Sequence, residues 1–122
     1  MFEIGQVEDD PRALSQAVLQ ITALLGLYQA ELARILQTEC PVIGQLASGR
    51  RCLEPGTTGW RQAALLVRMY RALYRTYAGD GAAMVHWLHV HQVLLGGIPH
   101  RMLVDERRLD AIVDCLERDG CG

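Results

Sequence analysis

Four histidines stand in the second half of the chain, and histidine is both a common metal ligand and a general acid or base. They are His86, His89, His91 and His100. On a helix, His86 and His89 would share a face, whereas His91 would turn about 140° away from His86. No carboxylate or cysteine completes a known zinc spacing around them, so we interpret all four as structural or surface residues and predict no metal ion.

The cysteines and serines do not indicate catalysis either. The four cysteines form no C-x-x-C pair, and we expect no zinc knuckle from Cys40, Cys52, Cys115 and Cys121. The only serines are Ser15 and Ser48, and neither stands beside a histidine in the sequence. The chain also has no nucleophile elbow, phosphate-binding loop or paired-carboxylate signature. The sequence therefore predicts a protein that is not an enzyme and that uses no cofactor.

The composition indicates a folded protein outside membranes. Half of the 122 residues are apolar, and a chain of this length can bury a core without disulfide or metal support. It has no basic and apolar leader at its start and no apolar run long enough to span a bilayer. We therefore expect a cytoplasmic protein with reduced cysteines that makes no contact with a membrane.

All 12 basic residues are arginine, and they are unevenly distributed. The net charge of −2 for the whole chain argues against nucleic-acid binding. Residues 34–75, however, carry seven arginines against Glu39 and Glu54, and the segments on both sides are acidic. A basic middle region is the footprint expected for phosphate contact, although an ordinary solvated helix face has the same composition.

Helical periodicity runs through nearly the whole chain, and no segment alternates like a β-strand between hairpin turns. Asp10 and Pro11 predict the start of a first helix, which should end at Gly26. Further helices are expected over residues 29–37, 41–47, 60–78 and 82–89, at Pro99, and finally up to Gly120 with Asp105 as the cap. The fold class is therefore predicted to be all-α.

The helix expected over residues 60–78 has the clearest two-faced pattern. Its apolar side should hold Leu66, Met69, Tyr70, Leu73 and Tyr77. Its opposite side should hold Arg61, Arg68, Arg71 and Arg75. We expect the first set to be buried and the second set to face solvent or phosphate.

Residues 27–49 resemble a helix-turn-helix of the phage-repressor type. The first helix would run from Leu27 to Leu36, where Ala33 permits close crossing, and the second from Pro41 to Gly49. The second helix would lie in a major groove, where Gln45 is the one outward side chain suited to paired hydrogen bonds with a base. We expect DNA contacts from Gln29, Gln45, Ser48, Arg50, Arg51 and Arg61, mostly through the three arginines on the phosphate backbone. A three-helix fold that kept its shape but lost tight base readout is the alternative.

From Trp60 onward the order of motifs resembles the MbcA/ParS/Xre antitoxin family, over about residues 12–120. The motifs are the Trp60–Leu66 segment, Trp87-Leu88, the run Leu95-Gly96-Gly97-Ile98-Pro99 and the amphipathic helix from Leu109 to Leu116. The chain departs from the family at Val90-His91, where a Pro-Asn pair is usual. It departs again at Glu106-Arg107-Arg108, where a glycine is common.

The resemblance implies an all-α antitoxin of a type II toxin–antitoxin system. Such a protein neutralises a RES-type toxin, an enzyme that degrades NAD, binds operator DNA of its own operon, and is often a homo-oligomer. It also implies a helix-turn-helix region over residues 11–78 and a toxin-binding domain over 79–120. Trp87 and Leu88 would anchor the second domain, and Gly96, Gly97 and Pro99 would form its tight turn.

An antitoxin of this kind would approach the NAD site of the toxin. Because that site accommodates a negative pyrophosphate, an acidic group such as Asp119 is a candidate to occupy it. The expected toxin-binding residues are His91, Gly96, Gly97, Pro99, Arg107, Arg108, Asp114, Arg118 and Asp119. The alternative hypothesis is a stand-alone helix-turn-helix transcriptional regulator that acts through residues 27–61.

Overall fold

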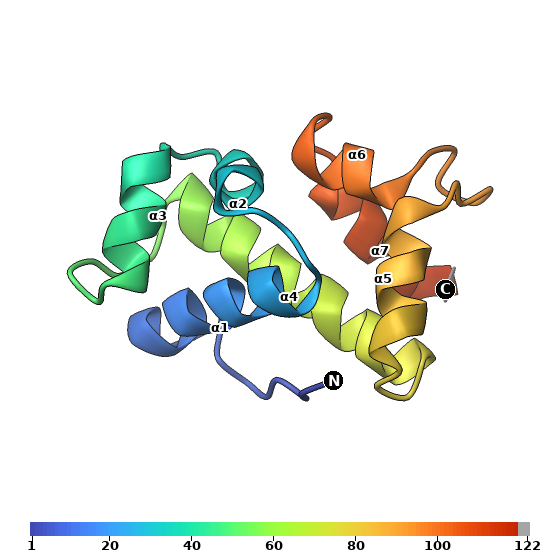
Figure 1. The fold of residues 1–122 in the computed structure, drawn as a ribbon, viewed down its shortest axis with the longest axis horizontal. Coiled ribbons are helices and arrows are strands. Elements are labelled where there is room, and N and C mark those ends of the chain that lie inside the picture. The colour runs from blue at the N-terminus through green and yellow to red at the C-terminus, as the bar shows by residue number, and fades with distance from the viewer. Residues whose placement is uncertain (120–122) are drawn as a thin grey trace.

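Seven α-helices build the part of the chain that the computed structural model describes, which is residues 1–119 without the side chain of Asp119 (Figure 1). They are α1 Pro11–Leu24, α2 Gln29–Leu36, α3 Cys40–Ala47, α4 Thr58–Thr76, α5 Gly81–His89, α6 Pro99–Val104 and α7 Leu109–Asp119. Within this range there is no β-strand, only one bridge between Gln92 and Gly97. The prediction of an all-α protein is confirmed. None of the described helices is long and apolar enough to cross a membrane.

Short polar residues cap several of these helices. The carboxylate of Asp10 accepts hydrogen bonds from two backbone N–H groups in the first turn of α1, as expected. The hydroxyl of Thr57 accepts one from the backbone N–H of Trp60, at 3.2 Å. Because of this cap, α4 begins two residues earlier than the periodicity predicts. Asp80 caps α5 in the same way.

The prediction that Asp105 caps the last helix is wrong. Asp105 is the residue that ends the short helix α6, and α7 begins four residues later, at Leu109. Its carboxylate instead accepts a hydrogen bond from Arg34 of α2, with 2.8 Å between Nη1 and Oδ1. Local spacing predicts a cap at Asp105, but its side chain binds Arg34, which is distant in the sequence.

Helix α4 lies between the two halves of the fold. In Figure 1 it runs diagonally, with α1 to α3 around its first part at the left and α5 to α7 towards the right. It packs against α1 and α2 as well as α7 and α5, and its buried residues belong to a single hydrophobic cluster that includes both halves. Four members of its predicted apolar side are fully buried, namely Leu66, Met69, Tyr70 and Leu73. Burial of such side chains contributes about 1.5–3 kcal/mol each, so α4 supplies much of what joins the halves.

The arginine side of α4 is not a uniform solvated face. Arg68 forms an ion pair with Glu117 of α7, and Arg71 forms one with Glu8 in the segment before α1. Both pairs join residues that are far apart in the sequence. The expectation that all four arginines of this side face solvent or phosphate is therefore wrong for Arg71, which is half-buried, whereas Arg68 is exposed but already paired.

The segment before α1 is fastened along α4. The amino group of Met1 donates to the carbonyl of Gly79 at 3.1 Å, and Tyr70 donates its hydroxyl to the carbonyl of Phe2. Arg71 binds the backbone carbonyls of Ile4 and Gly5 in addition to Glu8. Burial raises the pKa of Tyr70 above its ordinary value, so the phenol keeps its proton, and with it this hydrogen bond, to a higher pH than a free tyrosine would.

The cysteines depart from the expected reduced state at one position. Cys40 and Cys52 are free thiols, the first exposed and the second half-buried. Cys115 of α7 is disulfide-bonded, so the expectation of reduced thiols is wrong there. The expectation of reduced cysteines rested only on the cytoplasmic location inferred from the sequence. A location does not say which two thiols lie close enough to form a disulfide.

We predict that Arg71→Ala lowers the free energy of unfolding by about 2 kcal/mol, since it leaves a half-buried carboxylate and two carbonyls without their donor. Arg75→Ala is the matched control, because Arg75 is exposed on the same helix and should change stability by less than about 0.5 kcal/mol. Urea denaturation of both variants measures the difference. Equal losses would contradict a specific role for Arg71.

Candidate DNA-binding and partner-binding surfaces

Helices α2 and α3 form the corner that the sequence predicts. Leu32, Ala33 and Leu36 of α2 and Ile43 and Leu46 of α3 are buried. Glu31 accepts a hydrogen bond from the backbone N–H of Tyr28 at 2.8 Å, which fixes the start of α2.

The turn between α2 and α3 follows from the residue after α2. Gln37 adopts a left-handed conformation with a φ of 59°, and the backbone N–H of Thr38 donates to the carbonyl of Ala33 at 2.9 Å. This is the backbone pattern that commonly ends a helix, although glycine is the usual residue in it. Helix α3 then begins at Cys40, with Pro41 in its first turn.

Gln45, the residue predicted to contact a base, lies at the centre of a small group of polar side chains. The side-chain oxygen of Gln45 accepts a hydrogen bond from Nη1 of Arg51 at 3.1 Å. Its backbone carbonyl accepts from the hydroxyl of Ser48 and from the backbone N–H of Arg50, both at 3.1 Å. All four residues are exposed. The structure therefore brings together four of the six predicted DNA-binding residues at the end of α3.

The other two predicted DNA-binding residues lie apart from this group. Gln29 is the exposed first residue of α2. Arg61, on the second turn of α4, donates to the hydroxyl of Thr58 at 3.3 Å and lines a different hollow from Arg51.

A buried serine holds the segment that carries Arg50 and Arg51. The hydroxyl of Ser15 accepts a hydrogen bond from the backbone N–H of Leu53 at 2.9 Å and donates to the carbonyl of Pro11 at 2.6 Å. The sequence analysis did not predict this role, although the position of Ser15 directly after Leu14, a fully buried residue of α1, was the available signal. The segment after α3 is thereby tied to α1.

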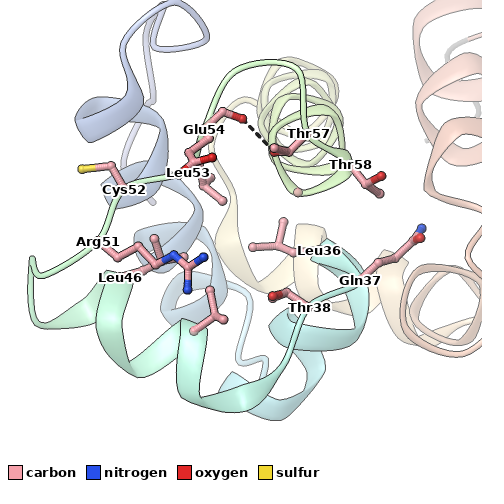
Figure 2. Close-up of a pocket in the computed structure, with 12 residues that line it drawn as sticks. Leu36, Gln37, Thr38, Leu46, Arg51, Cys52, Leu53, Glu54, Thr57 and Thr58 are labelled. Atoms are coloured by element: carbon pink, nitrogen blue, oxygen red, sulfur yellow. Dashed lines mark hydrogen bonds between the residues drawn. The ribbon is translucent and has the colours of Figure 1, made fainter.

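A hollow of about 260 Å³ lies behind α3, between the loop after that helix and the start of α4 (Figure 2). Leu36, Leu46 and Leu53 form its apolar lining, and Arg51 and Glu54 contribute charge. Figure 2 shows Glu54 bound through its carbonyl to the hydroxyl of Thr57, at 2.7 Å. One opposite charge accompanies the arginine, so the hollow has no net preference for an anion.

The C-terminal half contains the tight turn that the sequence predicts after α5. The backbone N–H of Gln92 donates to the carbonyl of Gly97 at 2.9 Å, and the side chain of Gln92 binds the carbonyls of Trp87 and Val90. Gly96 has a φ of 72°, which favours glycine. Pro99 opens α6, and the predicted anchors Trp87 and Leu88 are buried.

This turn exposes apolar side chains at its tip. Val93 and Leu94 are 85% and 69% exposed, and the neighbouring Val90 is 39% exposed. His91, a predicted toxin-binding residue, is also exposed beside them. Hydrogen bonds within the turn hold its shape, so these side chains are presented to solvent by a fixed backbone.

The remaining predicted toxin-binding residues lie on two other elements. Arg107 and Arg108 are exposed between α6 and α7, and Arg107 has a φ of 54°. On α7, Asp114 and Arg118 pair with each other at 2.8 Å. Asp119 ends α7, and its side chain lies outside the described residues. The nine predicted residues thus come from three segments of the chain.

Two contacts join α2 to α6. Nε2 of His100 lies 2.7 Å from Oε2 of Glu31, and Arg34 pairs with Asp105. The rings of His100 and His89 are 4.8 Å apart. Among the described residues, no three histidine, cysteine or acidic side chains come together as a metal site.

The ion pair between α4 and α7 shifts the pKa values of both partners. The hydrogen bond from Arg68 lowers the pKa of Glu117, and the same bond raises that of Arg68. Because the folded pKa of Glu117 lies below its unfolded value, the pair adds stability above the unfolded pKa. That stability is lost as the pH falls through the folded value. Both side chains are substantially exposed, so the contribution is small.

In comparisons with known proteins, the chain matches no protein-family model and no curated protein sequence.

We predict that Ser15→Ala lowers the free energy of unfolding by about 2 kcal/mol, since it leaves the buried N–H of Leu53 without an acceptor. It should also speed amide hydrogen exchange at Leu53 and in the loop that carries Arg50 and Arg51. Ser48→Ala is the matched control, because Ser48 is the only other serine and is exposed. Unchanged exchange in the Ser15 variant would show that the loop is held by other contacts.

Proposed function

We propose that this protein is an antitoxin of a type II toxin–antitoxin system, which binds and blocks a RES-type, NAD-degrading toxin. The proposal starts from the resemblance of residues 12–120 to the MbcA/ParS/Xre family. The observation that carries it is the turn over residues 90–97, whose tip exposes Val93 and Leu94 on a hydrogen-bonded backbone. Clustered exposed apolar side chains are typical of protein-binding surfaces.

The turn supports an inhibitory role because exposure of its apolar tip to water is unfavourable, and a bound partner would remove that exposure. Because hydrogen bonds already hold the backbone of the turn, binding orders little more of it, which favours these side chains as anchors. The exposed arginines between α6 and α7, together with Asp114 and Arg118, supply a charged surface on the same half of the chain. We propose that apolar contacts provide affinity and that these charges orient the toxin.

Operator binding is the second part of the proposal, and it also stands as the alternative function of a stand-alone regulator. It is supported by the α2–α3 corner and by the exposed group of Gln45, Ser48, Arg50 and Arg51. Since α3 itself has no charged side chain on its exposed face, most of the affinity would come from Arg50 and Arg51 on phosphates. Such a protein would bind as a homo-oligomer to repeated half-sites.

We predict that Val93→Asp combined with Leu94→Asp weakens toxin binding by about 2 kcal/mol or more, or roughly 30-fold, because charge replaces the apolar anchors. The protein is co-expressed with the product of the adjacent reading frame, and co-purification, growth and cellular NAD are measured. Phe2→Asp is the control, since Phe2 is an exposed apolar residue outside the C-terminal half. If the wild-type chain neither binds that product nor restores growth, the antitoxin proposal is wrong.

We predict that Arg50→Ala with Arg51→Ala reduces operator affinity at least tenfold. The slope of log affinity against log salt concentration should fall by the amount expected for the loss of about two phosphate contacts. The control is Arg12→Ala with Arg101→Ala, which removes the same charge from exposed positions on α1 and α6. Binding to DNA upstream of the gene is measured over a range of salt concentrations. Equal affinity for a scrambled sequence would reduce the interaction to non-specific contact.

A further inference from the structure

A groove of about 750 Å³ lies between α4 and the turn that joins α6 to α7. Its lining includes Arg61 and Arg68 from α4 and Arg107 from the turn, against the single carboxylate of Asp110. Trp60 forms part of the same wall and is half-buried. The groove therefore has an excess of positive charge beside a flat aromatic side chain.

The three arginines differ in what they already bind. Arg68 uses its guanidinium on both carboxylate oxygens of Glu117, so its charge is largely neutralised. Arg61 reaches only the hydroxyl of Thr58, and Arg107 has no side-chain hydrogen bond or ion pair within the described residues. Two guanidinium groups, one from each wall, thus remain available for an anion.

The backbone of Arg107 has a conformation that favours glycine. Its φ of 54° lies in the left-handed region, which costs a residue with a Cβ roughly 1 kcal/mol or more relative to glycine. Backbone hydrogen bonds hold this turn, from the N–H of Glu106 to the carbonyl of Arg101 at 3.1 Å and from the N–H of Arg108 to the carbonyl of Met102 at 2.9 Å. The side chain of Arg107 is thus presented to the groove by a fixed turn, and Arg107→Gly removes it at a position where glycine fits the backbone.

We propose that this groove binds a phosphate group between Arg61 and Arg107, carried by a ligand of mononucleotide size whose base lies against Trp60. Guanidinium groups match phosphate geometry and form charge-assisted hydrogen bonds to it. The volume is within the range of small-ligand sites.

The surrounding charge favours a single phosphate over a nucleic-acid chain. Asp110 lines the groove itself, and Glu117 holds Arg68 at its edge. A long polyanion crossing the groove would meet these carboxylates, whereas one phosphate fits between the two free arginines. The site is separate from the apolar turn over residues 90–97, although it shares Arg107 with the charged surface proposed to orient the toxin.

The test is calorimetric titration of the full chain at low salt with AMP, adenosine, inorganic phosphate and a short DNA duplex. We expect AMP to bind at least tenfold more tightly than adenosine or inorganic phosphate, with an affinity that falls as salt is added. Binding should also change the fluorescence of Trp60, because the other tryptophan, Trp87, is buried. Equal affinity for adenosine would overturn the phosphate site, and equal affinity for inorganic phosphate or preference for the duplex would overturn the mononucleotide assignment.

Two variants separate ligand binding from folding. Arg61→Ala and Arg107→Gly should each weaken AMP binding about tenfold, but Arg107→Gly should raise the melting temperature because it relieves the left-handed backbone. Arg12→Ala, which removes an exposed arginine that does not line the groove, should leave AMP affinity unchanged. AMP binding that is the same in all three variants, or that is absent in the wild-type chain, would overturn the proposal.

Discussion

The burial of α4 on two sides is the constraint on which the rest of the fold depends. One helix of 19 residues covers the apolar stripe of α1 and the first helix of the α2–α3 corner, and along the same length it covers α7. Neither half can therefore complete its core without it. The elements proposed to bind DNA and those proposed to bind a partner protein are positioned from one shared helix.

A second connection between the halves runs through α2. Glu31 and Arg34 lie one turn apart on this helix, and they contact His100 and Asp105 at the two ends of α6. Glu31 also fixes the start of α2 through the backbone of Tyr28. A partner that displaced α6 would have to break contacts that help to define the first helix of the corner. Any such displacement would thus affect both proposed surfaces.

The sequence predicted those features that depend on neighbouring residues. Asp10 and Pro11 mark the start of α1, and the i, i+3, i+4 spacing of apolar residues identifies the buried sides of α4 and α7. What it could not predict depends on partners far along the chain. Asp105 resembles a helix cap by position, yet Arg34 binds it across 71 residues.

The candidate surfaces show the same division between local and distant determinants. The turn at Gly96 and Pro99 could be predicted, because glycine and proline have strong local conformational preferences. The hydrogen bond from Leu53 to Ser15 could not, since it closes a loop of 38 residues. Likewise, no spacing rule indicates that Arg61 and Arg107, from the two halves, line one groove.

The distribution of charge along the chain acquires a different meaning in the folded protein. The basic middle and acidic ends first suggested a phosphate-binding centre, yet three of those arginines pair with carboxylates from the ends. Arg71 pairs with the N-terminal Glu8, whereas Arg34 and Arg68 pair with Asp105 and Glu117 near the C-terminus.

Several arginines of the basic middle region therefore form ion pairs that hold the two ends of the chain against its centre. Only arginines without such partners can attract an external phosphate at full strength, because a paired guanidinium must first give up its carboxylate. Among the arginines of residues 34–75, Arg50, Arg51, Arg61 and Arg75 meet that condition within the described structure, and Arg107 between α6 and α7 meets it as well. The capacity for binding anions is thus set by the charge that remains after internal pairing and not by the charge of each segment.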